Sequence, residues 1–196
     1  MTGGASRRAI AVGLAALGCT WAQADPAADP QRVAVFDWAL AETMLALNAP
    51  PLGVVGAGDW RRFVVSPLVA SLRPDLILTS PFLQHLEPQL RRIAPVLNLS
   101  IYQDDGAPLA LRKAVTRTLA QRIGKEREAE LYLAEAERTF DAASARFEAL
   151  APPPLLVVGF IDARHVRVYS GSSLFQNVLR RVGLSIAWPH ETGAFG

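Results

Sequence analysis

Short apolar runs alternate with amphipathic segments through the first half of the chain, and this alternation limits the fold more than any other feature. The apolar runs have the length of buried strands and lie at 32–36, 52–57, 75–80 and 95–100. Helical patterns lie between them at 37–49, with Asp37 as the expected N-cap, and at 87–94, with a proline in the first turn. Because the connections are short, this order predicts an α/β lobe with a largely parallel sheet.

Two successive helices are predicted between 108 and 150, where the alternation stops. The second, from about 125 to 150, carries an apolar stripe at spacings of three and four. The stripe consists of Leu133, Ala136, Phe140, Ala143, Phe147 and Leu150. A coiled coil has similar spacing, but a single stripe of this length also suits a long helix that lies across a globular body. The prolines of APPP (151–154) end the helix.

A second α/β region follows the prolines. Strands are predicted at 155–161 and 165–170, and a helix at 173–182, with Ser172 or Ser173 as its N-cap and Gly183 after its end. About 45 residues are too few to close a core of their own. The predicted organisation is therefore an N-terminal lobe at 25–124, an interlobe helix at 125–150 and a partial C-terminal lobe at 151–196.

Residues 1–24 have the pattern of an export signal peptide. Arg7 and Arg8 precede a short apolar run, and an Ala-x-Ala sequence ends at Ala24. The run is too short to span a bilayer, so a membrane anchor is the weaker reading. SRRAI (6–10) also fits the twin-arginine route, while the Sec route and a lipoprotein modified at Cys19 stay open.

The charge and cysteine content exclude several classes of function. Without residues 1–24 the chain has 18 basic and 18 acidic residues, so its net charge gives no reason to expect nucleic acid as a partner. Cys19 is the only cysteine, which removes disulfides, thiolate metal sites and thiol nucleophiles from the mature chain. Export without cysteines indicates the bacterial cell envelope.

The sequence contains no recognisable catalytic constellation. His85, His165 and His190 are far apart and lack the spacing of a zinc site, and the glycines of VVGAGDWR (54–61) lack the third glycine of a dinucleotide fingerprint. No set of nucleophile, base and orienting group can be proposed. We therefore expect a protein that is not an enzyme and that has no resident metal.

Aromatic residues, in contrast, follow the predicted strands or lie in loops. Trp38, Trp60 and Phe63 come after strands of the first lobe, and Trp188 and Phe195 lie in the last loop. A single aromatic residue is more often part of a core. Their shared placement at strand exits nevertheless suits ligand contacts, because open α/β lobes bind ligands there.

The segment PPLLVVGFIDARHVRVYSGSSLFQNVLRRVGLSIAWPHETGAFG (153–196) resembles the start of the second lobe of FhuD-type periplasmic ferric hydroxamate-binding proteins, nearly position by position. The segments RVAVFDWALAETMLALNAPPLGVVGA (32–57) and RRIAP (91–95) are similar to parts of their first lobe. The resemblance implies the bilobal class III periplasmic binding protein fold, with two α/β lobes joined by one rigid helix, here 126–150. The ligand of such proteins sits between the lobes.

The same resemblance implies partners and site residues. It places Trp38, Trp60 and Phe63 on the first-lobe wall of the site; its second-lobe counterparts are Ile161, Arg167, Trp188 and Phe195. It makes Glu87 a candidate docking residue for an inner-membrane ABC permease, although a glutamate that simply interacts with the helix dipole is an equal alternative. The implied protein is a periplasmic monomer that delivers a ferric hydroxamate siderophore to that permease.

The chemistry of the ligand agrees with an aromatic site. Three anionic hydroxamates around a trivalent ion give a neutral complex, which aromatic walls can desolvate without a buried countercharge. A triply anionic catecholate complex would need several cationic residues instead. Because the siderophore holds the iron, neither protein ligands nor a cofactor are expected. Haem or cobalamin remains an alternative cargo.

Three departures from the family pattern are visible. The segment that carries a hydroxamate-binding arginine is absent after Ser66, and the family's tyrosine aligns near Leu83, with Phe82 as the nearest aromatic residue. Family members also continue beyond the equivalent of Gly196, so we expect a truncated second lobe. Arg167 is a candidate to replace the missing arginine or to favour a siderophore with a free carboxylate. The rival hypothesis is a degenerate homologue that binds nothing.

Overall fold

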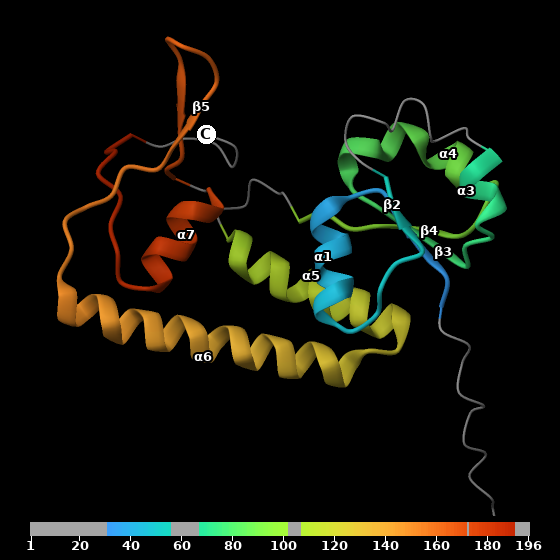
Figure 1. Cartoon of the computed structure of the whole chain (residues 1–196), viewed down its shortest axis with the longest axis horizontal. Helices are drawn as coiled ribbons and strands as arrows, with labels where there is room; N and C mark the ends of the chain where they lie inside the picture. The colour runs from blue at the N-terminus through green and yellow to red at the C-terminus, as the bar shows by residue number, and fades with distance from the viewer. Residues whose placement is uncertain (1–30, 56–66, 102–106, 172, 191–196) are drawn as a thin grey trace, which may run out of the picture. The chain divides into compact units, whose positions relative to one another are not determined.

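A four-stranded parallel sheet forms the centre of the first lobe in the computed structural model, which describes residues 31–55, 67–101, 107–171 and 173–190 (Figure 1). The strands are β1 (Val33–Val35), β2 (Gly53–Val54), β3 (Leu76–Thr79) and β4 (Val96–Asn98), and their order in the sheet is β2-β1-β3-β4. All three strand pairs are parallel. The strand pairing confirms the α/β class and the parallel sheet expected from the alternation.

The described helices include the five that the sequence predicts, two of them shorter than predicted, and also two that the sequence did not predict. They are α1 (Trp38–Ala46), α3 (Pro67–Ser71), the 3₁₀ helix η1 (Pro81–Leu86), α4 (Glu87–Leu90), α5 (Pro108–Ile123), α6 (Glu126–Leu150) and α7 (Leu174–Arg181). The two that the sequence did not predict are α3 and η1. The helix predicted at 87–94 ends at Leu90. The chain continues from there in turns, with the N–H groups of Arg92 and Ile93 bonded to the carbonyl oxygens of Gln89 and Leu90; Pro95 disfavours a helical conformation only at Ala94.

The N-cap predicted at Asp37 is confirmed. Its carboxylate accepts hydrogen bonds from the backbone N–H groups of Ala39 and Leu40, at 3.0 and 3.2 Å. These groups have no partner within the helix, so the cap satisfies two of the free donors at the start of α1. The cap thereby fixes Trp38 as the first helical residue, directly after β1.

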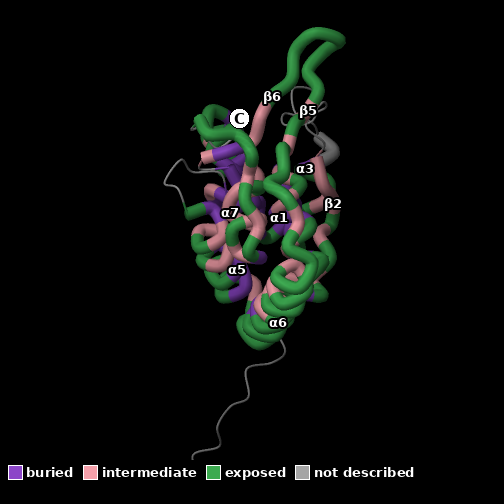
Figure 2. Tube along the Cα trace, turned by 90° about the vertical axis from the view of Figure 1, so that its left-hand side faces the viewer, coloured by how far each residue is buried: buried purple, intermediate pink, exposed green. Residues whose placement is uncertain are grey.

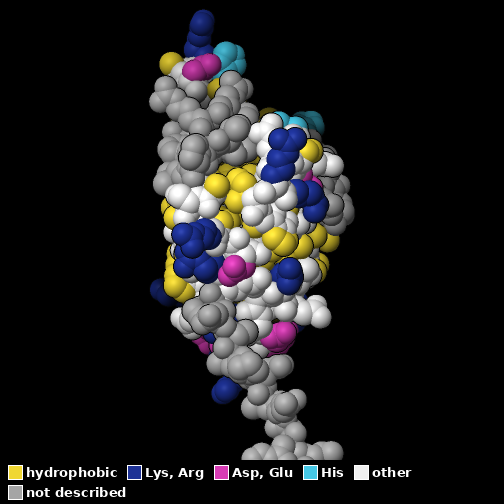
Figure 3. Space-filling view, turned by 90° about the vertical axis from the view of Figure 1, so that its right-hand side faces the viewer, with side chains coloured by type: hydrophobic (Ala, Val, Ile, Leu, Met, Phe, Trp, Pro, Cys, Tyr) yellow, Lys and Arg dark blue, Asp and Glu magenta, His cyan; other side chains and the backbone are white. Residues whose placement is uncertain are grey.

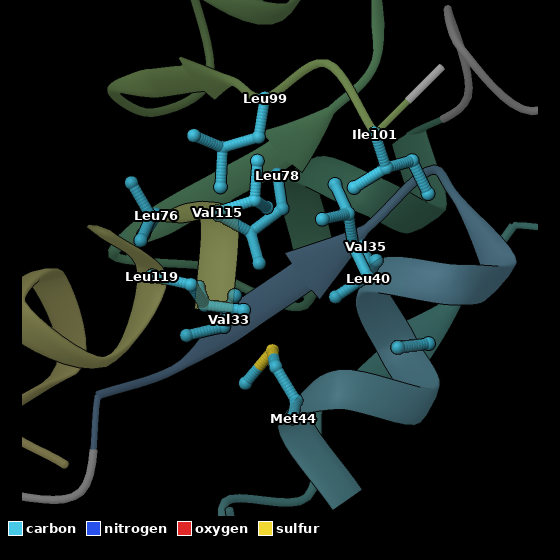
Figure 4. Packing of buried hydrophobic residues seen from close by; sticks show 11 residues of the cluster. Val33, Val35, Leu40, Met44, Leu76, Leu78, Leu99, Ile101, Val115 and Leu119 are labelled. Carbon is cyan, nitrogen blue, oxygen red and sulfur yellow. The ribbon is translucent and has the colours of Figure 1, made fainter. Parts of the chain in front are cut away.

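Alternate side chains of the strands pack on opposite faces of the sheet. Val33 and Val35 of β1, with Leu76 and Leu78 of β3, belong to a buried cluster that includes residues of α1 and α5 (Figure 4). The residues between them, such as Ala34 and Ile77, belong to a second cluster with residues of α3, η1 and α4. Burial on both faces explains why the strands read as continuous apolar runs instead of alternating ones.

The long helix α6 is anchored mainly by its first half. Ala129 is fully buried with Leu47, the C-cap of α1, and with Ala120 of α5, and Leu133 is buried one turn later. From there to the end of the helix the predicted stripe is only half-buried, and Leu150 is exposed. Much of the α6 tube in Figure 2 is accordingly coloured as exposed. The single long helix is as predicted. In its second half, however, the apolar stripe is not fully buried against other described parts of the chain. Among the described residues, no helix combines the length and the hydropathy needed to cross a membrane.

The region after α6 contains a hairpin and one helix. The strands β5 (Val158–Phe160) and β6 (Val166–Val168) are antiparallel, and Leu155 forms an isolated parallel bridge with Ile186. The Ser173 hydroxyl accepts a hydrogen bond from the Gln176 N–H at 3.2 Å, so it is the N-cap of α7. No side chain of α7 is buried.

Glu137 connects α6 to two other helices, α5 and α7. It forms ion pairs with Lys113 of α5 and with Arg181 of α7, the latter at 2.9 Å. Arg181 also pairs with Asp141 at 2.6 Å and lies over the ring of Phe140, 5.5 Å from its centroid. The hydrogen bonds from Lys113 and Arg181 lower the pKa of Glu137 below its ordinary value, although desolvation opposes the shift.

A Glu137→Gln substitution is expected to reduce the acid dependence of stability. A carboxyl group whose pKa is lower in the folded state stabilises the fold above its unfolded pKa, about 4.3, and loses that contribution as the pH falls through the folded value. The difference in melting temperature between wild type and Glu137→Gln should therefore be largest near neutral pH and shrink below about pH 4. Glu135→Gln is the matched control, because Glu135 pairs with Arg138 of the same helix. A difference in melting temperature that does not change with pH would show that the ion pairs of Glu137 contribute nothing to stability.

Candidate functional site

The carboxyl edge of the parallel sheet is the best candidate for a binding surface in the first lobe. The chain leaves this edge at Phe36 after β1, at Ser80 after β3 and at Leu99 after β4. Phe36, Ser80 and Leu99 are themselves buried, so the side chains that follow them are the ones available to a ligand. Open α/β sheets bind ligands at this edge because loops from several strands converge there.

Trp38 is the predicted site residue that the structure places at this edge. Its side chain is 67% exposed, although the N-cap at Asp37 fixes its backbone. The indole Nε1–H donates a hydrogen bond to the Glu42 carboxylate at 2.8 Å, one helical turn away. This bond orients the ring while leaving an apolar face exposed. Burying that face against a ligand would be favourable.

Phe82 is a further exposed aromatic residue at the same edge, and the sequence-based site did not include it. It follows β3 within η1 and is exposed, whereas its neighbour Leu83 is buried in the core. The signal that could have found it is the one that found Trp38, an aromatic residue just after a buried strand. The Ser100 hydroxyl, after β4, is buried with no hydrogen-bond partner among the described residues.

The predicted residues of the second region lie on the hairpin and the chain after α7. Ile161 and Arg167 are exposed on the β5–β6 hairpin, and Trp188 is 39% exposed. The Trp188 ring makes an edge contact with the ring of His190, with 5.4 Å between centroids. Ser170 ties this segment to the hairpin, because its hydroxyl donates to the His190 carbonyl oxygen at 3.0 Å.

The turn of the hairpin is held by one carboxylate. Asp162 accepts hydrogen bonds from the backbone N–H groups of Arg164 and His165, at 2.7 and 2.9 Å, and contacts the His165 ring. The hydrogen bond from Arg164, followed by those from His165, lowers the pKa of Asp162. The turn thus fixes the strands that carry Ile161 and Arg167. His165 serves this turn, and no cluster of potential metal ligands occurs in the described part of the chain.

Glu87, the candidate docking residue, is engaged within its own lobe. Its carboxylate accepts hydrogen bonds from the Asn98 amide and from Arg91, the latter at 3.0 Å, and its side chain is 16% exposed. The hydrogen bond from Asn98, helped by Arg91, lowers the pKa of Glu87, although burial acts in the opposite direction. The position at the start of α4 fits the dipole interaction that the sequence left as the alternative.

The remaining predicted residues cannot be placed. Trp60, Phe63 and Phe195, like the glycines at 56–58 and the segment 1–24, lie outside the described residues. Among the described residues, Trp38 forms no hydrogen bond or ring contact with Ile161, Arg167 or Trp188. The predicted site residues that are described therefore form two separate groups, Trp38 at the edge of the sheet and the others on the hairpin and the chain after α7. On one face, hydrophobic side chains are exposed among lysines and arginines (Figure 3).

A small cavity lies next to Trp38, with Ala39 and Ile101 in its lining. It measures about 180 Å³ and is lined by residues of α1, α5 and α6, including Thr43, Lys113 and Tyr132. Sites for small molecules usually measure about 300–1,000 Å³.

Comparison with known proteins identifies relatives of the same architecture. The iron(3+)-hydroxamate-binding protein FhuD of Escherichia coli K12 is 29% identical over 188 residues, which are 87% of this chain and 63% of the relative. The crystal structure of the siderophore-binding protein FhuD from Vibrio cholerae, bound to Fe3+–Desferal, is 28% identical with a TM-score of 0.73, and the match covers 85% of this chain and 71% of that one.

A third relative supports the fold alone. The siderophore-binding protein BauB, bound to ferric iron and two molecules of acinetobactin, is 21% identical with a TM-score of 0.64 over 83% of this chain and 63% of that one. The chain thus spans less than two thirds of the length of the E. coli relative.

The family model described as "Periplasmic binding protein" matches residues 67–195, which is more than half of the chain. This match covers part of the first lobe, the whole of α6 and nearly all of the second region. It agrees with the parallel sheet, the long helix and the structural neighbours with the same fold. The chain therefore belongs to the periplasmic binding protein family.

Proposed function

We propose that this chain binds a ferric siderophore of the hydroxamate type in the periplasm and delivers it to an inner-membrane ABC permease. The observation that carries the proposal is Trp38, an exposed indole fixed by an N-cap at the carboxyl edge of the sheet. The name of the E. coli relative and the Fe3+–Desferal bound to the Vibrio cholerae protein support the ligand class. The proposed role is binding without catalysis.

The apolar character of the site suits a neutral chelate. Trp38 and Phe82 are exposed at the edge of the first lobe, and Ile161 and Trp188 are exposed in the second region. A ferric trihydroxamate carries no net charge, so contact with these side chains removes apolar surface from water without a charge to compensate. In this proposal the siderophore supplies every iron ligand, so the protein needs no metal-binding residue and no cofactor.

Arg167 is the cationic group of the proposed site. It is exposed on β6 in the middle of the hairpin, directly opposite Gly159 of β5. A guanidinium can donate hydrogen bonds to hydroxamate oxygens, which carry partial negative charge even in a neutral complex. It is the residue of this chain that we propose in place of the arginine that the family pattern leads one to expect.

An Arg167→Leu substitution is expected to weaken ferrichrome binding about tenfold, because a hydrogen bond from a charged donor contributes roughly 1.5 kcal/mol. Isothermal titration would measure the change. Arg164→Leu is the control, since Arg164 is an exposed arginine of the same hairpin. A loss of affinity only for siderophores with a free carboxylate would instead assign Arg167 to recognition of that group. Unchanged affinity for every ligand would remove Arg167 from the site.

The proposed partner in the membrane is the permease of an ABC importer. Glu87 is the proposed contact on the first lobe, at the start of α4. A permease arginine that pairs with Glu87 would have to share its carboxylate with Asn98 and Arg91. The export pattern of residues 1–24 is consistent with the periplasmic location, and the route of export stays a sequence-based prediction.

Thermal unfolding with and without ligand tests the proposed function. A ligand that binds only the folded state at 100 times its dissociation constant stabilises it by about 2.7 kcal/mol, which raises the melting temperature by roughly 5–10 °C for a chain of this size. Ferrichrome should produce this shift, and iron-free desferriferrichrome should not. A shift with haem or cobalamin alone would change the ligand class, and no shift with any of them would identify a homologue that binds nothing.

A further inference from the structure

The ring of Trp38 is held by a carboxylate on its own helix. The indole Nε1–H donates a hydrogen bond to Glu42 Oε1 at 2.8 Å, and both side chains are exposed on α1. Residues four positions apart lie on the same face of a helix, so this bond forms without help from another element. An exposed tryptophan ring without such a partner can occupy several rotamers. The bond therefore selects an orientation of the ring before a ligand arrives.

The fold itself makes little use of Glu42. The N-cap of α1 is supplied by Asp37, and Glu42 lies in the middle of the helix, where the helix dipole has little effect on a side chain. Among the described lysines, arginines and histidines, none forms an ion pair with Glu42. Its hydrogen bond with Trp38 and its negative charge are therefore both available to the proposed site.

Cations of α5 lie on a neighbouring side of α1. Arg112 and Lys113 line the small cavity together with residues of α1 that immediately follow Trp38 and Glu42 in the sequence. Lys113 pairs with Glu137 of α6, which offsets its charge. Glu42, in contrast, is bonded to the indole ring itself. Because the interaction between charges weakens with distance, its carboxylate acts more strongly on a ligand that lies against this ring.

We propose that Glu42 positions the Trp38 ring and sets the charge preference of the site, so that cationic and neutral ferric chelates bind more tightly than anionic ones. The inference rests on the proposed function, because it requires a chelate to lie against Trp38. A ring that is already oriented loses less freedom on binding. A carboxylate beside the ring repels a chelate of its own sign, and together with the aromatic face it attracts a cationic one.

Three chelates that share one iron-binding core and differ in charge test this role. Ferrioxamine B, the ferric complex of Desferal, has one positive charge on its terminal ammonium group. Acetylation of that group gives a neutral chelate, and succinylation gives a chelate with one negative charge. Isothermal titration at low ionic strength should show that wild-type affinity falls in this order, by about threefold for each unit of charge. The differences should shrink at about 0.5 M salt, because salt screens exposed charges.

Two substitutions of Glu42 separate the charge from the hydrogen bond. Glu42→Gln keeps an acceptor for the indole N–H, so the neutral chelate should lose only about twofold in affinity while the three affinities become nearly equal. Glu42→Ala removes the acceptor as well, and the neutral chelate should lose about fivefold. Glu126→Gln is the matched control. Glu126 is exposed at the start of α6, one turn before Ala129, which packs on Leu47 at the far end of α1. This control should keep the wild-type charge preference.

The NMR signal of the indole N–H group reports the positioning of the ring without any ligand. The Trp38 signal, identified by its loss in Trp38→Phe, should move upfield in Glu42→Ala and stay close to its wild-type position in Glu126→Gln. An unmoved signal in Glu42→Ala would overturn the positioning role. Equal wild-type affinities, tightest binding of the succinylated chelate, or a charge preference that survives in Glu42→Gln would overturn the charge role and leave the proposed function intact. If the wild-type protein binds none of the three chelates, the proposed function fails, and this inference fails with it.

Discussion

Replacing Trp38 with alanine is expected to weaken ferrichrome binding about 30-fold or more. An indole that becomes buried against a ligand removes roughly 100 Å² or more of apolar surface from water, and each Å² contributes about 25 cal/mol. Trp38 is exposed in the absence of ligand and lies outside the core clusters, so the same change should leave the stability of the unliganded protein nearly unaltered. Isothermal titration measures the first effect, and thermal unfolding measures the second.

Leu45→Ala is the matched control for this substitution. Leu45 is 57% exposed, lies on the same helix as Trp38 and is the residue before its last. The Leu45→Ala substitution therefore removes an exposed apolar group of comparable kind away from the edge of the sheet. Ferrichrome affinity should not change. Equal losses of affinity for the two variants would show that α1 acts through general stability. An unchanged affinity for Trp38→Ala would remove the first-lobe wall of the proposed site.

Replacing Leu78 with alanine is expected to lower the free energy of unfolding by about 3 kcal/mol. Leu78 is fully buried in β3, which pairs with β1 on one side and β4 on the other. Its side chain is part of the cluster that joins the sheet to α1 and α5 (Figure 4). Large-to-small substitutions in such cores cost about 2–5 kcal/mol because they lose buried area and leave a cavity.

Urea denaturation measures this loss, and Leu131→Ala provides the comparison. Leu131 is 59% exposed on α6, so its truncation should change the free energy of unfolding by less than about 0.5 kcal/mol. A similar small change for Leu78→Ala would mean that the parallel sheet is not the stable centre of the fold. The positions of β1 and β3, and with them the edge that carries Trp38, would then be in question.

The fold could be predicted from the sequence where the signals are local. The strand β1 and the helix α1 follow from one buried apolar run and the carboxylate of Asp37, and the structure confirms both. Ser173 caps α7 in the same way, and the prolines after Leu150 mark the end of α6. Each of these features depends on residues within about one helical turn of each other.

Features that depend on contacts between residues far apart in the sequence could not be predicted from it. The antiparallel pairing of β5 with β6, and the 3₁₀ helix before α4, depend on how the chain is packed against other elements. The ion pairs of Glu137 join residues 24 and more positions apart, and no spacing rule connects them. The same limit applies to Glu87, because its hydrogen bond with Asn98 forms only when β4 lies beside α4.

The candidate site was partly predictable for the same reason. Trp38 could be found because the residue after a buried strand lies at the edge of a parallel sheet. Phe82 satisfies the same rule, but the sequence comparison with the family named it only as the aromatic residue nearest to Leu83. Ile161 and Arg167 came only from the family resemblance, because nothing local distinguishes them from ordinary surface residues. Trp188 was also found as one of the aromatic residues in loops.

The most direct test of a neutral ferric chelate as the ligand is a titration of the intrinsic tryptophan fluorescence of the purified protein. Ferrichrome should change the emission of the wild-type protein in a saturable way with one site per chain, with a weaker response in Trp38→Ala, while a ferric tris-catecholate of net charge −3 should bind far less well. Emission that stays flat with excess ferrichrome, after correction for absorption by the ligand, would contradict the proposed site.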